Sequence, residues 1–289
     1  MPSAEPRSIN KLSVSTELAA KLARLCDDLR RMGRVIVAYS GGVDSSFLAY
    51  AASQILGNDS LAVTGISPSL ARGERKAAEA LALWLGIPHR LLPIGELRDP
   101  AYTANGPDRC YQCKRHLFTA LSSVASEERY YYVLDGNNAD DLLDNRPGRQ
   151  AGHEAGVRSP LIEHEFSKAE IRAVARAAGL PNADKPSSPC LASRLPTGVR
   201  VTEMALAAVE EAEQALRTLG ITDGRVRYHG DLARLEVPRE FWPQVTREPT
   251  RSAILAALRL CGFQYITLDM RYFREEFKTS ENRALVNTN

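Results

Sequence analysis

The chain has 289 residues, of which 44% are hydrophobic and 25% are charged, the balance of a globular protein. Its formal net charge is only +2, which excludes the strongly basic field of a protein that wraps nucleic acid. No apolar run approaches the roughly 20 residues that a membrane-spanning helix requires. Residues 1–10 are polar and lack the apolar core of a signal peptide, so we expect a cytoplasmic protein.

The first two thirds of the chain alternate between short apolar runs and amphipathic segments. The apolar runs predict strands at 35–39, 61–66, 89–94 and 130–134, and the amphipathic segments predict helices at 16–32, 47–55, 72–85, 111–124 and 167–178. This alternation predicts an α/β fold with a doubly wound parallel sheet. Ligands of such sheets bind at the carboxyl ends of the strands, where Ser40, Ser67 and Asn137 fall.

The last third of the chain has a different pattern. Four prolines rule out regular structure between residues 180 and 200, namely Pro181, Pro186, Pro189 and Pro196. Beyond them we predict a helix at 202–219, strands at 225–228 and 233–237, a helix at 252–260 and a strand at 265–268. The sequence therefore predicts two domains, a parallel-sheet domain at 1–190 and a smaller C-terminal α+β domain at 191–289.

The strand at 35–39 runs directly into Ser40-Gly41-Gly42-Val43-Asp44-Ser45-Ser46, and a helix follows at once. Two glycines let the backbone turn sharply beside an anion, and the free N–H groups of a helix start favour negative charge. The hydroxyl groups of Ser40, Ser45 and Ser46 add donors for phosphate oxygens. The segment predicts a pyrophosphate cradle and ATP chemistry, and the alternative is an ordinary glycine-rich turn.

Other phosphate and nucleophile motifs do not fit this segment. The chain contains no Gly-Lys pair, which excludes a Walker A loop, and no G-x-G-x-x-G follows a strand. A nucleophile elbow needs glycine where this chain has Ala38. The segment resembles the Ser-Gly-Gly-x-Asp-Ser loop of the PP-loop ATP pyrophosphatases, which implies that fold for the 1–190 domain. That resemblance implies adenylation of a substrate oxygen with release of pyrophosphate, and Asp44 is placed to bind Mg²⁺.

Five cysteines without an export signal favour metal binding or catalysis over disulfides. Cys110 and Cys113 form a C-x-x-C pair, and Cys190 lies in the proline-rich segment. From the residues alone, four interpretations stay open: an iron–sulfur cluster on three cysteines, a redox pair, a Cys₃His zinc site with His116, or a lone Cys190 nucleophile. Cys26 and Cys261 fall on apolar helix faces, where we expect buried core cysteines.

Four further segments resemble the LarE family of ATP-dependent sulfur transferases of nickel-pincer nucleotide biosynthesis, the pathway of lactate racemase maturation. They are Asp135-Gly-Asn-Asn-Ala-Asp-Asp, Arg146-Pro-Gly, Gly156-Val-Arg-Ser-Pro-Leu and Lys185-Pro-Ser-Ser-Pro-Cys-Leu-Ala-Ser-Arg. The resemblance spans about residues 16–270. It implies that a carboxylate of pyridinium-3,5-biscarboxylic acid mononucleotide is adenylated and converted to a thiocarboxylate, with ATP and Mg²⁺ as cofactors.

The resemblance also bears on the cysteines. In some members the cysteine matching Cys190 gives up its own sulfur, whereas others hold a 4Fe-4S cluster with three cysteines. Because this chain has Cys110 and Cys113, it is similar to the second group, and the resemblance implies a cluster held by Cys110, Cys113 and Cys190. Asp140 and Asp141 are weaker magnesium candidates, with a solvated acidic loop as their alternative.

Cations are expected around a phosphorylated, carboxylated substrate. Arg225 and Arg227 alternate on one predicted strand and therefore share a face, and Arg194 follows Cys190 by four residues. The resemblance implies that these three arginines match substrate-phosphate positions and that Glu213 matches an acidic one. The alternatives are a solvated strand face for the arginines and a solvated helix face for Glu213.

The expected partners are a small-molecule nucleotide substrate and further copies of this chain, because family members form rings of subunits; nucleic acid and membranes are not expected. Three rival functions stay open. A tRNA-thiolating PP-loop enzyme would need a basic surface that the net charge of +2 does not favour. An amide-forming PP-loop ligase would have no use for Cys190, and a zinc-stabilised nucleotide-binding module would be non-catalytic.

Overall fold

The computed structural model describes residues 6–142, 147–271 and 273. The chain divides into two compact units, Met1–Cys190 and Leu191–Asn289, here called unit 1 and unit 2. The strands of unit 1 are β1 (Val35–Ala38), β2 (Ser60–Ile66), β3 (His89–Pro93) and β4 (Tyr132–Leu134). Its α-helices are α1 (Thr16–Met32), α2 (Val43–Leu56), α3 (Arg72–Trp84), α4 (Pro100–Thr103), α5 (Arg109–Glu128), α6 (Pro147–Glu154), α7 (Pro160–Glu163) and α8 (Lys168–Ala178).

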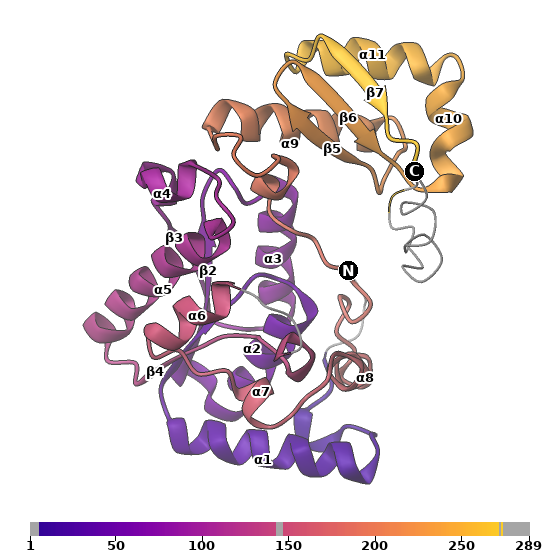
Figure 1. Ribbon diagram of the computed structural model, residues 1–289. Coiled ribbons are helices and arrows are strands. Elements are labelled where there is room, and N and C mark those ends of the chain that lie inside the picture. The colour runs from indigo at the N-terminus through magenta and orange to yellow at the C-terminus, as the bar shows by residue number, and fades with distance from the viewer. Residues whose placement is uncertain (1–5, 143–146, 272, 274–289) are drawn as a thin grey trace, which may run out of the picture. The chain divides into compact units, whose positions relative to one another are not determined.

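Unit 1 is built on a parallel sheet with strand order β3-β2-β1-β4. Alternate residues of β1 point to opposite faces, so Val35 and Val37 join one apolar cluster and Ile36 joins another. The first cluster includes residues of α1, α2, α3 and α8, and the second includes residues of α5 and α6 (Figure 1). Helices therefore cover both faces, and the prediction of an α/β, doubly wound parallel sheet is confirmed.

Capping residues explain where the helices of unit 1 begin and end. Ser15 caps α1, with its Oγ accepting from the Leu18 N–H at 3.3 Å, and Gly33 ends that helix. Ser167 and Glu170 form the capping box that the sequence predicts at the start of α8. One boundary matters for function: α5 begins at Arg109 rather than near Tyr111, which brings Cys110 into its first turn.

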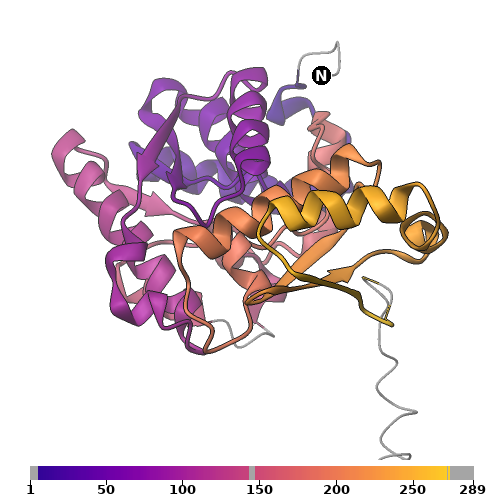
Figure 2. The same cartoon turned by 90° about the horizontal axis from the view of Figure 1, so that it is seen from above.

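Unit 2 contains β5 (Arg225–His229), β6 (Leu232–Glu236) and β7 (Tyr265–Leu268), with α9 (Glu203–Thr218), α10 (Trp242–Thr246) and α11 (Thr250–Leu260). The strand order is β5-β6-β7, with an antiparallel first pair and a parallel second pair. Helices α9 and α11 lie side by side over one face of this sheet (Figure 2) and share its apolar cluster. This is the α+β arrangement that the sequence predicts.

The proline-rich segment contains one regular turn that the sequence does not predict. Residues Leu191–Arg194 form a 3₁₀-helix between Pro189 and Pro196. Our exclusion of regular structure from 180–200 is wrong at this point, because a single turn fits between two prolines without needing their missing N–H groups. Among the described residues, no helix is both long enough and apolar enough to cross a bilayer.

Candidate active site

Hydrogen bonds of its own serines fix the conformation of the loop between β1 and α2. The Oγ atoms of Ser40 and Ser45 lie 3.0 Å apart, and the Ser45 Oγ also donates to the Gly42 carbonyl at 3.2 Å. Gly42 caps α2, so the first N–H groups of the helix have no partner within the helix. The predicted residues Ser40–Ser46 thus form a turn and helix start with backbone donors available for an anion. Ser46, however, is fully buried and lines neither cavity described below, so the structure gives no support to the predicted phosphate contact of its hydroxyl.

Two glycines fix this loop against its neighbours. Gly41 has φ +72°, and a Cβ there would lie 2.9 Å from the Ala78 Cβ of α3. Gly136, in the loop after β4, would place a Cβ 2.8 Å from the Ser45 backbone nitrogen. Both positions need glycine, because a side chain would push α3 or the β4 loop away from the cradle.

Asn182 supports the loop from a distant part of unit 1. Its Nδ2 donates to the Gly41 carbonyl at 3.1 Å and to the Ser46 Oγ at 2.9 Å, and the residue is buried. Sequence reasoning missed this residue, since a single asparagine after a helix carries no motif.

Asp44 is the most unusual carboxylate of the loop. Its Oδ2 accepts from the Lys168 Nζ at 2.5 Å, whereas its Oδ1 is buried without a hydrogen-bond partner among the described residues. Burial raises the pKa of Asp44 above its ordinary value, Lys168 opposes that rise and Asp141 adds to it. Lys168, at the start of α8, was not predicted from the sequence.

The two weaker acidic candidates differ from each other. Asp141 is buried at 7% exposure, so the alternative of a solvated acidic loop is wrong for that residue. Asp140 is exposed, and its Oδ2 accepts from the Lys168 backbone N–H at 2.9 Å.

The loop between β1 and α2 forms part of the wall of two cavities. The first, of about 270 Å³, crosses the carboxyl ends of β4, β1, β2 and β3 and includes Glu96 and Cys113. The second, of about 410 Å³, includes Lys168, Lys185 and Cys190. Both cavities are lined by Ser40, Gly42, Asp44, Leu70 and Lys114. A ligand bound at the loop can therefore face Cys113 in the first cavity and Cys190 in the second.

The three candidate cysteines approach one another from two segments. Cys110 and Cys113 lie three residues apart in the first turn of α5 and share one side of it. Burial raises the pKa of the Cys113 thiol to about 12, with smaller contributions from Glu96, Cys190 and Cys110. Cys190 is thus near enough for its charge to act on Cys113, although 77 positions separate them in the sequence.

The neighbouring histidine has another partner. The His116 Nε2 lies 2.8 Å from the Asp99 Oδ2, and the described residues contain no group of three His, Cys, Asp or Glu side chains that could hold a metal ion. The structure therefore gives no support to a Cys₃His zinc site. Cys26 is buried as predicted, but Cys261 is only half-buried because α11 ends there.

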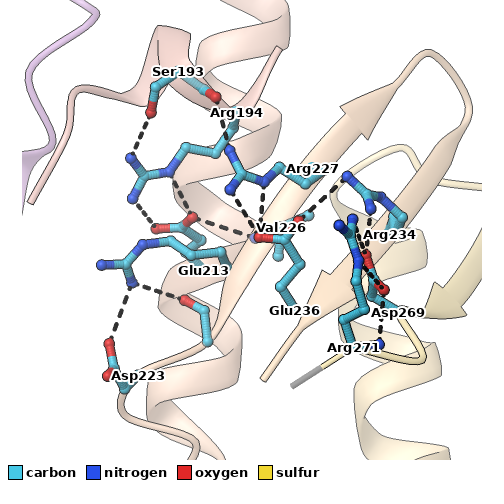
Figure 3. A network of polar contacts seen from close by, with 12 residues as sticks. Ser193, Arg194, Glu213, Asp223, Val226, Arg227, Arg234, Glu236, Asp269 and Arg271 are labelled. Atoms are coloured by element: carbon cyan, nitrogen blue, oxygen red, sulfur yellow. Dashed lines mark hydrogen bonds and ion pairs between the residues drawn. The ribbon is translucent and has the colours of Figure 1, made fainter. Parts of the chain in front are cut away.

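The candidate substrate residues of unit 2 form a network of ion pairs (Figure 3). Arg194 and Glu213 are 4% and 3% exposed, and the Arg194 Nε lies 2.9 Å from the Glu213 Oε1. The alternative of a solvated helix face is thus wrong for Glu213. Arg225 and Arg227 flank the buried Val226 on β5 and share the other face, as predicted.

Carboxylates and a carbonyl hold these guanidinium groups in place. Arg227 pairs with Glu236 at 2.8 Å and donates to the Ser193 carbonyl at 2.9 Å. Arg225 lies over the Phe273 ring, 5.1 Å from its centroid, and 3.7 Å from the Asp223 carboxylate. Arg225 and Arg227 are both half-buried, and each has at least one acidic partner. This arrangement orients their N–H donors.

Comparison with known proteins identifies the family, although no family model matches the chain. An uncharacterised protein of Synechocystis is 43% identical over 257 residues, which are 89% of this chain and 96% of that protein. The pyridinium-3,5-bisthiocarboxylic acid mononucleotide synthase of Lactiplantibacillus plantarum is 37% identical over 265 residues, 89% of this chain and 93% of the synthase. This chain belongs to the LarE family. A tRNA-specific 2-thiouridylase of Roseiflexus is 27% identical over 54% of this chain.

The LarE segments noted in the sequence line the two cavities or contact residues that line them. In Gly156–Leu161, Arg158 extends the sheet by a bridge to Leu134, and the Ser159 Oγ donates to Asp135 at 2.7 Å. In the Lys185–Arg194 segment, Lys185 pairs with Glu74 at 2.6 Å beside Cys190. Arg146 lies outside the described residues.

Proposed function

We propose that this protein is an ATP-dependent sulfur transferase that adenylates a carboxylate of pyridinium-3,5-biscarboxylic acid mononucleotide and converts it to a thiocarboxylate. One observation carries the proposal: Cys190 lines the same cavity as the Ser40–Asp44 loop, and Cys113 lines the adjoining cavity. A phosphate cradle and two thiols therefore face a shared space. We assign ATP binding to unit 1, and substrate binding during sulfur transfer to unit 2.

The loop provides the first half of the reaction. A substrate carboxylate oxygen attacks the α-phosphorus of ATP, and pyrophosphate leaves. The N–H groups at the start of α2 and the hydroxyl groups of Ser40 and Ser45 stabilise the charge on that leaving group. Lys114 lines both cavities and forms no ion pair among the described residues, so its charge is available to an anion.

Asp44 fits a magnesium ligand. Its Oδ1 is a buried, unpartnered carboxylate oxygen on the cavity wall, the donor type that Mg²⁺ prefers. When bound, Mg²⁺ neutralises part of the phosphate charge. Lys168, which pairs with the other oxygen of Asp44, keeps that carboxylate oriented.

In the second half, a sulfur nucleophile attacks the acyl carbon, and AMP leaves. We propose that Cys110, Cys113 and Cys190 hold a 4Fe-4S cluster, which when bound supplies a sulfide on the iron without a cysteine ligand. Support for this donor set comes from electrostatics, because Cys190 and Cys110 both lie near enough for their charges to raise the pKa of the Cys113 thiol.

Arg194, Arg225 and Arg227 are proposed to bind the phosphate of the substrate, with Glu213 fixing Arg194. Support comes from their fixed guanidinium groups, which match the geometry of phosphate oxygens. A cytoplasmic location, a homo-oligomeric state and the lack of a nucleic-acid partner stay predictions from the sequence.

A second route is favoured by one observation: Cys190 is exposed, and it is the one candidate thiol on the wall of the 410 Å³ cavity. Its thiolate could attack the acyl adenylate, releasing AMP and forming a thioester. Elimination would then break the Cys190 Cβ–Sγ bond, leaving a thiocarboxylate on the substrate and dehydroalanine in the chain, with the Cα proton passing to a base.

The test is an anaerobic assay with Mg-ATP and pyridinium-3,5-biscarboxylic acid mononucleotide, in which AMP, pyrophosphate and thiocarboxylate are measured by mass spectrometry. We expect all three from the unmodified protein. Cys190→Ala should still release pyrophosphate, and AMP as water hydrolyses the acyl adenylate back to the carboxylate, but form no thiocarboxylate. The control Cys261→Ala should match the unmodified protein. Thiocarboxylate formation by Cys190→Ala at the normal rate would contradict the proposal.

A further inference from the structure

Glu96 is a buried carboxylate that the reaction described above does not use. It is the first residue of the 3₁₀-helix Glu96–Arg98 that follows β3, and its exposure is 1%. Its Oε2 has no hydrogen-bond partner among the described residues. A buried acceptor without a hydrogen bond destabilises the fold. We therefore expect a bound ligand to donate a hydrogen bond to this oxygen.

Glu96 lines the same cavity as Ser40, Gly42, Asp44 and Ser45 of the loop. The loop follows β1, Glu96 follows β3, and β2 lies between them. Two strand spacings amount to roughly 10 Å, which is comparable to the length of a nucleoside. The wall between the two points includes the apolar residues Val63, Ile94 and Leu117, a suitable surface for a flat ring.

Two other partners for Glu96 are not favoured by the contacts. The Tyr102 hydroxyl lies near enough for Glu96 to raise its pKa, though burial is the main cause of that rise, and it hydrogen-bonds the Ser69 Oγ at 2.6 Å. A metal ion would need at least a third suitable side chain, and none completes such a group in the described part of the chain.

On the basis of the proposed function, we infer that Glu96 accepts a hydrogen bond from the nucleoside of ATP and so helps to select that nucleotide. An ionised carboxylate is an acceptor only, and adenosine offers donors of two kinds, the 6-amino group of the base and the ribose hydroxyls. Either donor would satisfy the buried Glu96 Oε2, and the bond would be charge-assisted with the ionised carboxylate.

Calorimetric titration with Mg²⁺ and nucleotide, without the second substrate, tests this inference. The ligands are ATP, 2′-deoxy-ATP, 3′-deoxy-ATP and purine riboside triphosphate, which lacks the 6-amino group. The proteins are the unmodified chain, Glu96→Gln and the control Glu17→Gln, an exposed residue of α1. Each analogue is compared with ATP in the same protein, so any inactive fraction cancels.

We expect Glu96→Gln to bind ATP about tenfold more weakly, and Glu17→Gln to bind it normally. One analogue should bind the unmodified protein about tenfold more weakly than ATP, yet bind Glu96→Gln as well as ATP does; the identity of that analogue names the donor. Equal losses for every analogue in both proteins, or normal ATP binding by Glu96→Gln, would overturn the inference but not the proposed function. Failure of the unmodified protein to bind ATP would overturn both.

Discussion

Two regions differ in how their buried polar groups are paired. One is the cavity that Ser40–Asp44 and Glu96 line in unit 1, here called the loop site. The other is the set of ion pairs around Arg194 and Arg227 in unit 2, here called the network. At the loop site, three buried acceptor atoms have no hydrogen-bond partner in the described part of the chain, namely the Asp44 Oδ1, the Glu96 Oε2 and the Asn182 Oδ1. In the network, Arg194 faces Glu213 and Arg227 faces Glu236. The loop site therefore leaves buried oxygens for ligand groups, whereas the arginines of the network are held by their own acidic partners, with the Arg234 Nε as an exception among the described residues.

This difference separates two uses of a charged residue. A charge in the network, besides the phosphate contact proposed for its arginines, contributes to the stability of unit 2, because removal of one partner leaves the other buried alone. A carboxylate at the loop site opposes stability and contributes to binding instead. The predictions below test that separation, from the largest expected effect to the smallest.

The largest expected effect is that of Glu213→Gln on stability. The neutral side chain leaves the Arg194 guanidinium buried without its counter-charge, so the free energy of unfolding should fall by about 3–5 kcal/mol in urea titrations. Glu211→Gln, an exposed residue on the same helix, should change it by less than about 0.5 kcal/mol. Equal small effects from both variants would show that the network does not stabilise unit 2.

The next prediction concerns Cys113 in metal-free protein. An ordinary cysteine has a pKa of 9.0 and Cys113 one of about 12, so near neutral pH its thiolate fraction is about 1000-fold smaller. Iodoacetamide should modify exposed Cys110 and Cys190 first, and the rate at Cys113 should rise about tenfold per pH unit up to pH 11. Peptide mass spectrometry measures the three rates, and rapid labelling of Cys113 at pH 7 would contradict the burial of this thiol.

Asp44→Asn should lower the rate of AMP formation about 10²–10³-fold, because the carboxylate proposed to hold Mg²⁺ is gone. The raised pKa of Asp44 means that the fold favours its protonated form, and this contribution to stability disappears as the pH rises through that pKa. At neutral pH the variant should therefore unfold no more easily than the unmodified protein. If Asp44→Asn lost much stability but formed AMP at the normal rate, Asp44 would be a structural residue and not a magnesium ligand.

Gly41→Ala tests the packing of the loop with the smallest expected effect. Both Gly41 and Gly57 have positive φ, but a Cβ would meet Ala78 only at Gly41. We expect Gly57→Ala to cost about 1 kcal/mol of unfolding free energy and Gly41→Ala about 1–2 kcal/mol more, with weaker ATP binding for Gly41→Ala alone. An equal loss of unfolding free energy in Gly41→Ala and Gly57→Ala would mean that α3 shifts to accept the new Cβ without a cost.

The sequence predicts the parts of this site that are contiguous. The Ser40–Ser46 loop was found because strand, turn and helix follow one another in register. Lys168, Asn182 and Glu96 were missed because they enter from distant segments and belong to no motif. Glu213 was ambiguous beside Glu210 and Glu211, since a run of acidic residues on a helix does not reveal which one turns inward.

The central claim has two parts. Cys190 lies next to a nucleotide bound by the Ser40–Asp44 loop, and its thiol is a ligand of a cluster that the reaction does not consume. The most direct measurement combines an iron assay with the intact mass of the chain after product formation under anaerobic conditions. We predict about four irons per chain, lost in Cys110→Ala, and an unchanged mass after turnover. Iron-free active protein, or a chain lighter by one sulfur and two hydrogens at Cys190, would contradict the claim.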